Sequence, residues 1–116
     1  MDWFTGLFTP SRSFSVPHQS SAERVREVLD ASLQQAMEQA FTMPVARVST
    51  RTDAHDDKRL HFRYEVGGRP LWGSLTVQPR SVQVAITLSF AASIVFSVDS
   101  VRTALQSELS NLFSIL

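Results

Sequence analysis

The chain has 116 residues, with 11 Lys+Arg, 11 Asp+Glu and no cysteine. This length fits one domain, because two separate hydrophobic cores are hard to build from so few residues. Since 43% of the residues are hydrophobic, the chain is too apolar to be disordered. The formal net charge of zero lacks the basic excess of most nucleic-acid-binding proteins, so we expect no nucleic-acid partner. Without cysteine there is no disulfide scaffold, thiolate zinc site or thiol nucleophile.

An apolar segment, residues 1–11, precedes the predicted single domain, residues 12–116. It has Asp2 rather than a positive charge near its start and no continuous apolar core, so it matches neither a secretory signal nor an organelle transit peptide. No apolar run approaches the roughly 18 residues of a membrane-spanning helix, which favours a cytoplasmic protein without a transmembrane segment. If residues 2–8 become helical, large apolar side chains share one side and can contact an apolar surface, a partner chain or the core. These side chains are Trp3, Phe4, Leu7 and Phe8.

The first predicted elements are a short strand and a long amphipathic helix. Residues 12–16 alternate between polar and apolar, as a strand does. A helix is predicted over residues 21–41, and Ser20 and Glu23 have the spacing of a capping box at its start. Pro44 prevents this helix from continuing. The apolar stripe of the helix consists of Val25, Val28, Leu29, Leu33, Met37 and Ala40.

The hydrophobic period changes to two after this helix. Residues 45–51 form a weak strand with Ala46 and Val48 directed inward, and the sequence leaves its place in the sheet open. A charged loop, residues 53–58, leads to the clearest strand, residues 59–66. The inward side chains of that strand are Leu60, Phe62, Tyr64 and Val66, and the outward ones are Arg59, His61, Arg63 and Glu65.

Two further strands complete an antiparallel meander. Gly67 and Gly68 predict a tight turn into a strand over residues 69–78, because glycine tolerates the positive φ that such a turn needs. A second turn leads to a strand over residues 82–90. These turns are too short for crossovers, so neighbouring strands must be antiparallel. The inward residues of the last strand are Val82, Val84, Ile86, Leu88 and Phe90.

The chain ends in a second amphipathic helix. Residues 91–96 form a helical or irregular link, and Ser97 or Asp99 caps the helix that follows. The stripe of this helix consists of Val101, Leu105, Leu109, Leu112 and Leu116, with Val98, Ala104 and Ile115 beside it.

Together these elements predict an α+β fold of the order β-α-β-β-β-β-α. An antiparallel sheet of four to five strands carries both amphipathic helices on one face. The helices and the sheet each have an apolar surface to bury, and packing them together meets both demands. We therefore expect a dry interior filled with hydrocarbon.

The polar residues give little support to catalysis. The histidines lack metal-ligand spacing, and a solvated loop explains His55, Asp56 and Asp57 better than a metal site does. The carboxylates fall on outward positions, where little tunes their pKa values. No serine has the glycines of a nucleophile elbow. We expect no enzymatic activity, no cofactor and no metal.

One alternative is a small ligand carrier or lyase-like enzyme with a cavity between helices and sheet. Such a cavity needs an inward polar group or a missing side chain, and only Tyr64 and Gly73 provide one. Close approach of a helix is the commoner reason for a glycine at such a position.

The outward sheet face is mildly basic and carries one tryptophan. Arg59, His61 and Arg63 alternate along one strand, and Trp72 points outward from the next. A nucleic-acid surface would need more stacking aromatics, so a solvated face is the better interpretation. A lone outward tryptophan is also typical of a face that pairs with another subunit, or it packs under the N-terminal segment. We predict a homo-oligomer that self-associates through Trp72, His61 and Arg63.

Two stretches, SVPHQSSAERVREVL within residues 13–39 and GGRPLWGSLTVQPRSVQVAITLSF, resemble the polyhydroxyalkanoic acid system protein family. The shared pattern is a strand leading to a histidine and a capped helix, a glycine-containing strand pair G-x-x-x-x-G-x-L-x-V, a strand ending in Leu-x-Phe and a closing helix. The resemblance spans residues 12–116, and this chain departs from it in residues 1–11 and in a longer stretch over residues 42–58. The matching positions are His18, Ser20, Glu23, Gly68, Gly73, Leu75, Val77, Leu88 and Phe90.

Members of this family are small bacterial proteins encoded near the genes for polyester storage granules. The resemblance implies a structural or regulatory accessory role in polyhydroxyalkanoate metabolism rather than that of a synthase or depolymerase. The implied partners are the granule surface or granule proteins, which makes the expected location cytoplasmic or granule-associated. An oligomeric adaptor for other proteins remains an alternative.

Overall fold

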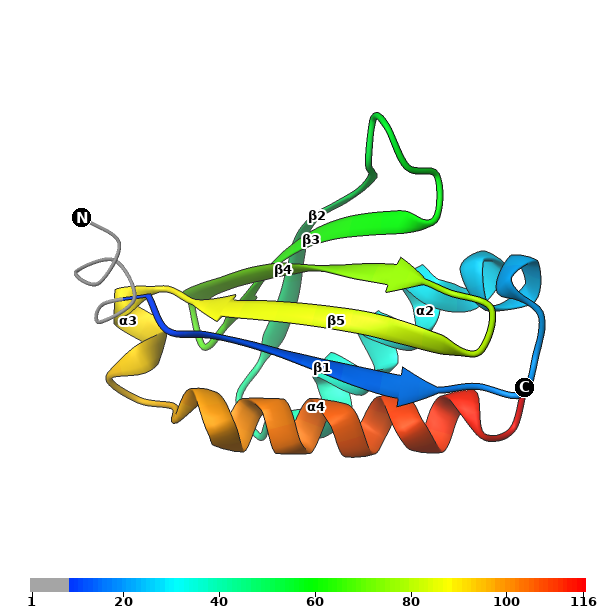
Figure 1. Cartoon of the computed structure of the whole chain (residues 1–116). Helices are drawn as coiled ribbons and strands as arrows, with labels where there is room; N and C mark the ends of the chain where they lie inside the picture. Colours follow the sequence, from blue (N-terminus) through cyan, green and yellow to red (C-terminus); the bar gives the residue numbers. More distant parts are fainter. Residues whose placement is uncertain (1–8) are drawn as a thin grey trace.

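The computed structural model describes residues 9–116 and shows an α+β fold. One five-stranded antiparallel sheet has helices packed on one of its faces (Figure 1). The predicted order of elements is confirmed, with one short helix added before the last one. The elements are β1 (Ser11–Pro17), α2 (Ala22–Ala40), β2 (Val45–Thr52), β3 (Arg59–Val66), β4 (Arg69–Val77), β5 (Ser81–Leu88), α3 (Phe90–Ser93) and α4 (Val98–Phe113).

The strand order β1-β5-β4-β3-β2 places the first strand beside the last one. β3 to β5 form the predicted meander, in which Gly67 and Gly68 take positive φ values of 58° and 78° between β3 and β4, and β2 extends it by one strand. β1 pairs with β5, so α2 must carry the chain across the sheet to its opposite edge, where β2 pairs with β3. The place of the 45–51 strand, which the sequence left open, is therefore an edge of the sheet.

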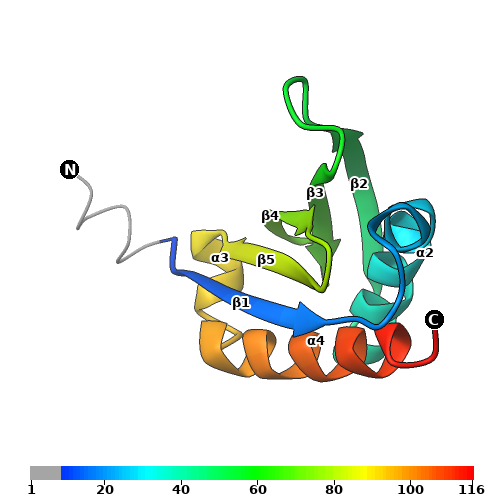
Figure 2. The same cartoon turned by 45° about the vertical axis from the view of Figure 1, so that its right-hand side comes forward.

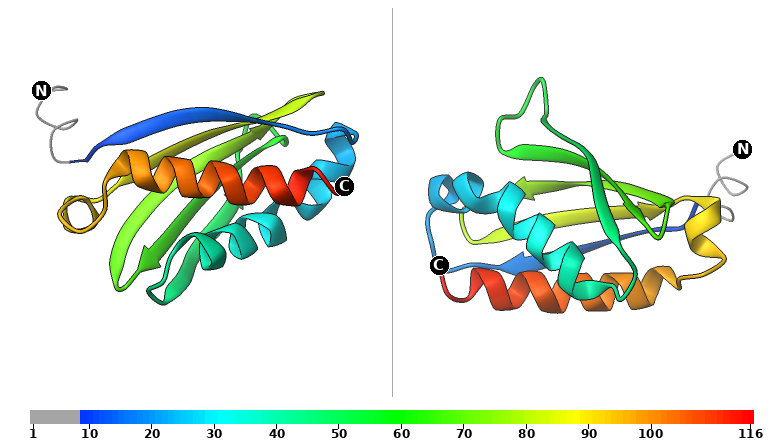
Figure 3. Two further views of the ribbon diagram at one scale, coloured as in Figure 1. Left: turned by 90° about the horizontal axis from the view of Figure 1, so that it is seen from below. Right: turned by 180° about the vertical axis from the view of Figure 1, so that it is seen from behind.

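The two long helices lie on the same sheet face. Seen from below, α2 and α4 lie beside one another on the sheet, and α4 packs along β1 (Figure 3). The loop between β2 and β3 projects beyond the rest of the sheet (Figure 2). The opposite sheet face carries no helix among the described residues, and we call it the outer face.

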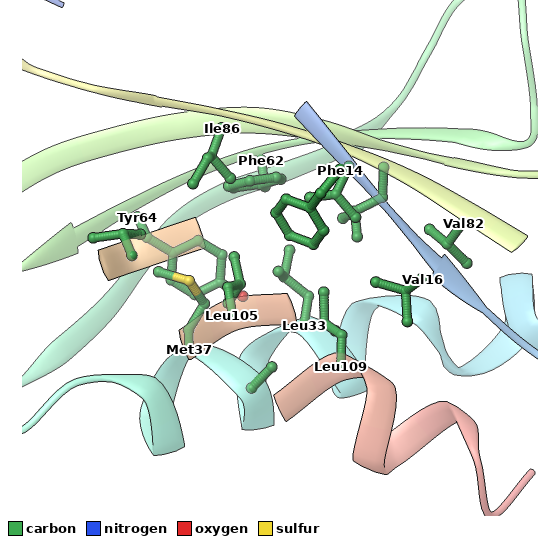
Figure 4. Close-up of a cluster of buried hydrophobic side chains, with 14 of the residues drawn as sticks. Phe14, Val16, Leu33, Met37, Phe62, Tyr64, Val82, Ile86, Leu105 and Leu109 are labelled. Carbon is green, nitrogen blue, oxygen red and sulfur yellow. The ribbon is translucent and has the colours of Figure 1, made fainter. Parts of the chain in front are cut away.

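Apolar side chains fill the space between the helices and the sheet. Phe62 and Tyr64 of β3 meet edge to face, with ring centroids 6.0 Å apart. Met37 of α2 and Leu105 of α4 approach the Tyr64 ring from the helices (Figure 4). The described layer is thus one continuous apolar cluster, which agrees with the inward positions predicted for β3 and, up to Leu88, for β5.

The cap of α2 differs from the predicted capping box by one residue. The N-cap is Ser21, whose hydroxyl accepts a hydrogen bond from the Arg24 backbone N–H at 3.1 Å. Ser20 and Glu23 therefore do not form the reciprocal pair. The prediction for α4 is better, because Ser97, one of its two candidates, is the N-cap.

The inward positions predicted for β2 are wrong. Ala46 is exposed, and the Val48 side chain is 49% exposed. The pairing register with β3 shifts between Arg47 and Ser49, which is a bulge at Val48. Before the bulge, Val45 and Arg47 pair with the inward residues Val66 and Tyr64, so Ala46 faces outward, and Val48 is the extra residue of the bulge.

Two other apolar positions also lie outside the core. Phe90 was predicted to be the last inward residue of a strand, but β5 ends at Leu88 and the Phe90 side chain is 53% exposed at the start of α3. Ile115, predicted beside the α4 stripe, is 81% exposed because α4 ends at Phe113. Phe113 takes the last buried place on this helix.

Candidate functional site

The three residues predicted for sheet-face self-association lie together on the outer face. His61 and Arg63 stand two residues apart on β3, and Trp72 of β4 is the direct cross-strand partner of Arg63. Arg51 of β2 is the cross-strand partner of His61 on the other side. An open hollow of about 220 Å³ is lined by Ser49, Arg51, His61, Phe62, Arg63, Trp72 and Gly73.

The Arg63 guanidinium lies over the Trp72 ring, 5.8 Å from its centroid. This is a cation–π contact, in which the negative face of the indole attracts the cation. Trp72 is half-buried and points outward, as the strand alternation predicted. The contact holds the guanidinium beside the indole, and Arg63 as a residue is exposed to solvent.

His61 is directed outward as predicted, but its side chain is only 32% exposed. Its Nε2 lies 2.6 Å from the Asp53 carboxylate at the start of the charged loop. This hydrogen bond lowers the pKa of Asp53 to about 2, with the His55 backbone N–H as a second contributor. Sequence reasoning missed this pair because Asp53 reaches β3 only through the fold of the loop.

Exposed apolar side chains gather at the end of the molecule where β5 passes into α3. Ile94 is 66% exposed and Val95 and Phe90 are also exposed. We call these three residues the apolar end. Beside them a groove of about 280 Å³ is lined by Ala40, Phe41, Thr42, Val95, Phe96, Ser97, Ser100, Val101 and Ala104.

The groove at the apolar end lies where the end of α2 meets the start of α4. The Phe41 and Phe96 rings pack edge to face across it, with centroids 5.3 Å apart. Sequence reasoning missed this groove because Phe96 and Phe41 belong to the connections after α3 and α2. No periodic pattern of hydrophobic residues there indicates which side chains lie together.

The four predicted contact residues, Trp3, Phe4, Leu7 and Phe8, lie outside the described residues. The described chain nevertheless begins beside the apolar end, because the Leu88 backbone N–H donates to the Pro10 carbonyl at 3.0 Å. Leu88 is the last residue of β5, two positions before Phe90. Residues 1–8 are therefore covalently attached at the end of the sheet that carries the exposed apolar side chains.

His18, one of the positions that carry the family resemblance, is a buried polar residue. It is 4% exposed between the end of β1 and the start of α2. Its Nε2 donates to the Gln78 carbonyl at 2.8 Å, and its backbone N–H donates to the Arg80 carbonyl at 3.0 Å. Both bonds join β1 to the β4–β5 turn, so His18 has a structural role at this joint. Its Nδ1 is buried without a partner among the described residues.

The two inward hints of a cavity, Tyr64 and Gly73, both have close neighbours. The buried Tyr64 hydroxyl donates to Gln34 Oε1 at 3.4 Å. A Cβ on Gly73 would collide with the Ala85 carbonyl oxygen of β5 and lie 2.8 Å from Phe62 Cζ. Gly73 thus permits close approach of a strand and a ring, where we had expected a helix.

The charged loop between β2 and β3 uses its carboxylates for turns. Asp53 Oδ1 accepts from the His55 backbone N–H at 2.8 Å, and Asp56 Oδ1 accepts from the Lys58 backbone N–H at 3.0 Å. Within residues 9–116, no group of three or more His, Asp or Glu side chains is placed to hold a metal ion.

The chain matches no protein-family model and no curated protein. None of the described helices is long and apolar enough to span a membrane. The geometry of the outer face and of the apolar end therefore carries the functional argument, together with the resemblance in the sequence.

Proposed function

We propose that this chain is a non-enzymatic accessory protein of polyhydroxyalkanoate storage granules, where it contacts the polyester surface. The apolar end and the attached residues Trp3, Phe4, Leu7 and Phe8 make this contact. The observation that carries the proposal is the position of three exposed large apolar side chains at the end where residues 1–8 join the sheet.

The magnitude of apolar burial suits reversible attachment. Fully burying one large apolar side chain stabilises by about 1.5–3 kcal/mol. Phe90, Ile94 and Val95 together offer several kcal/mol before the cost of immobilising the protein on a surface is subtracted. Single exposed apolar residues are common on protein surfaces, whereas a group of neighbouring ones commonly marks an interaction site.

Several positions that carry the family resemblance have structural roles in this fold. His18 joins β1 to the β4–β5 turn, Gly68 takes a positive φ and Gly73 admits the Phe62 ring. Leu75 and Val77 belong to the core. The resemblance therefore supports a shared fold, and the exposed Phe90 of its Leu-x-Phe pattern belongs to the apolar end.

The Asp53–His61 pair does not favour a hydrolase. A catalytic triad needs a nucleophile hydrogen-bonded to the second nitrogen of the histidine. Ser74 of β4 is the cross-strand partner of His61. Among the described residues, however, the only hydrogen bond of the His61 ring goes to Asp53.

A granule partition experiment tests the proposal. Purified polyester granules are mixed with the wild-type chain and with a variant in which Trp3, Phe4, Leu7 and Phe8 are all replaced by Ser. We expect the wild type to sediment with the granules and the variant to remain in the supernatant. Unchanged partition of the variant, or no sedimentation of the folded wild type, rejects surface contact by this end.

A further inference from the structure

We infer that the hollow on the outer face binds a phosphate group, with Arg51 and Arg63 as its ligands. This inference does not depend on the granule proposal, because the apolar end and the outer face are different surfaces. It begins from two arginines that line one open hollow.

The positions of the two arginines allow them to share one ligand. Arg51 pairs with His61 across the β2–β3 ladder, and Arg63 lies two residues further along β3. Such diagonal positions on one sheet face are within reach of long side chains. Both arginines project from a hydrogen-bonded antiparallel ladder, so the backbone positions that carry them are fixed before a ligand arrives.

Neither guanidinium is neutralised by an acid in the described part of the chain. Arg63 contacts the Trp72 ring, and the Arg51 side chain has no ion pair or hydrogen-bond partner among residues 9–116. The Asp53 carboxylate nearby is already bonded to His61 and the His55 N–H. The other outward arginine of β3, Arg59, donates to the Thr76 hydroxyl and lies outside the hollow.

A phosphate group complements this arrangement better than a carboxylate does. Its terminal oxygens carry a charge of about −1.5 to −2 at neutral pH, which matches two guanidinium groups. The planar fork of arginine donates two parallel hydrogen bonds to phosphate oxygens. The Trp72 contact fixes the Arg63 fork in advance and so reduces the ordering cost of binding.

A second copy of the chain fits the hollow less well. Packing two outer faces together would remove Arg51 and Arg63 from water, and no carboxylate within hydrogen-bonding distance accompanies them. Burying an unpaired charge costs several kcal/mol. The self-association predicted from Trp72, His61 and Arg63 thus competes with ligand binding for the same surface, and the experiment distinguishes the two.

Trp72 provides a reporter inside the site. The chain has two tryptophans, so a Trp3→Phe background leaves Trp72 as the only one. The fluorescence of this protein is titrated with inorganic phosphate, with adenosine 5′-monophosphate and with uncharged adenosine. We expect saturable changes with both phosphates and none with adenosine. Tighter binding of the nucleotide than of inorganic phosphate would show that the base also contacts the site.

Matched variants separate a built site from general charge attraction. Arg51→Ala should weaken phosphate binding at least about tenfold, as expected for loss of a charged hydrogen bond. Arg63→Lys keeps the charge but loses the planar fork, so it should also weaken binding. Arg80→Ala removes the same charge from the exposed β4–β5 turn and should leave binding within about twofold, as is usual for distant surface changes. Circular dichroism confirms that each variant is folded.

Three results would each overturn the inference. The first is the absence of a saturable response in the folded protein, and the second is equal binding by wild type and Arg51→Ala. The third is a wild type that is dimeric in solution and becomes monomeric in Trp72→Ala, since a second copy would then cover the hollow. Phosphorus NMR line broadening gives a second readout that does not depend on Trp72 fluorescence.

Discussion

His61 Nε2 lies 2.6 Å from Asp53 Oδ2 and ties the loop after β2 to the outer face of β3. The same aspartate uses its other oxygen to accept from the His55 N–H, and its own backbone N–H donates to the Arg59 carbonyl at 2.9 Å. Asp53 therefore joins the two ends of the loop, which Arg26 of α2 also holds by donating to the Asp57 carbonyl at 3.0 Å. The hollow lies directly beside the Asp53–His61 pair, because His61 lines it.

The Asp53–His61 pair predicts how stability responds to acid. The pKa of Asp53 is about 2 instead of 3.8, chiefly because of the hydrogen bond from His61. The unfolded chain binds this proton more readily, so the contribution is complete above pH 3.8 and is lost as the pH falls toward 2. Urea unfolding at stepped pH should show a steeper loss over this interval for wild type than for Asp53→Asn. Equal slopes for the two proteins would contradict the role of the carboxylate.

Tyr64 predicts the opposite response, in alkali. Burial, followed by the negative charge of Asp30, raises the pKa of Tyr64 to about 12. Its contribution to stability is complete below pH 10 and is lost as the pH rises toward 12, because the folded state favours the neutral hydroxyl. Tyr64 is the only tyrosine of the chain, so tyrosinate absorbance reports it alone. We expect a midpoint near 12 when folded, a lower one in Asp30→Asn and one near 10 in urea.

The inner face of the sheet could be predicted from the sequence because its signal is local. Buried and more exposed residues alternate along β3 and β5, so several residues in each strand independently indicate which face is buried. β2 is different, since the bulge at Val48 changes the phase in the middle of the strand. A single alternating pattern therefore cannot assign the faces of the residues on both sides of the bulge, and no turn residue in the sequence marks the change.

The candidate site was predictable only in part. Trp72, His61 and Arg63 follow from strand parity, and the structure places them around one hollow. Arg51 joins them only because β2 pairs with β3, which the sequence left open, and Asp53 only because the loop folds back onto β3. The apolar end was missed because Phe90 continues the alternation of β5 by one step, while the chain has already turned into α3.

The cap of α2 distinguishes two adjacent serines. The Ser21 hydroxyl accepts from the Arg24 N–H, whereas Ser20 lies outside the helix. Replacing an N-cap serine by alanine costs typically about 1 kcal/mol. Chemical denaturation should therefore show Ser21→Ala less stable than wild type by this amount and Ser20→Ala nearly unchanged. If Ser20→Ala were the less stable of the two variants, the predicted capping box of Ser20 and Glu23 would be correct instead.

Gly73 should not tolerate a methyl group. A Cβ there would meet the Ala85 carbonyl oxygen and the Phe62 ring, and neither the strand backbone nor the buried ring can withdraw easily. Overpacking of this kind costs typically about 1–3 kcal/mol. We expect Gly73→Ala to lower the unfolding free energy by at least this range, while the neighbouring Ser74→Ala on the outer face changes it by less than about 0.5 kcal/mol. Similar stabilities for the two variants would mean that the strands can separate at this point.

The apolar end offers a direct comparison with another exposed apolar residue. Phe90→Ser with Ile94→Ser removes two exposed side chains at this end, and Ile115→Ser removes one that is 81% exposed at the opposite end of α4 (Figure 1). Burial of one such side chain on a polyester surface is worth about 1.5–3 kcal/mol, so the double variant should bind granules at least about tenfold more weakly. Ile115→Ser should bind like wild type, because only the end that carries residues 1–8 faces the polymer. Equal weakening by the two changes would indicate unspecific adsorption of exposed hydrocarbon, and unweakened binding by the folded double variant would remove α3 from the contact.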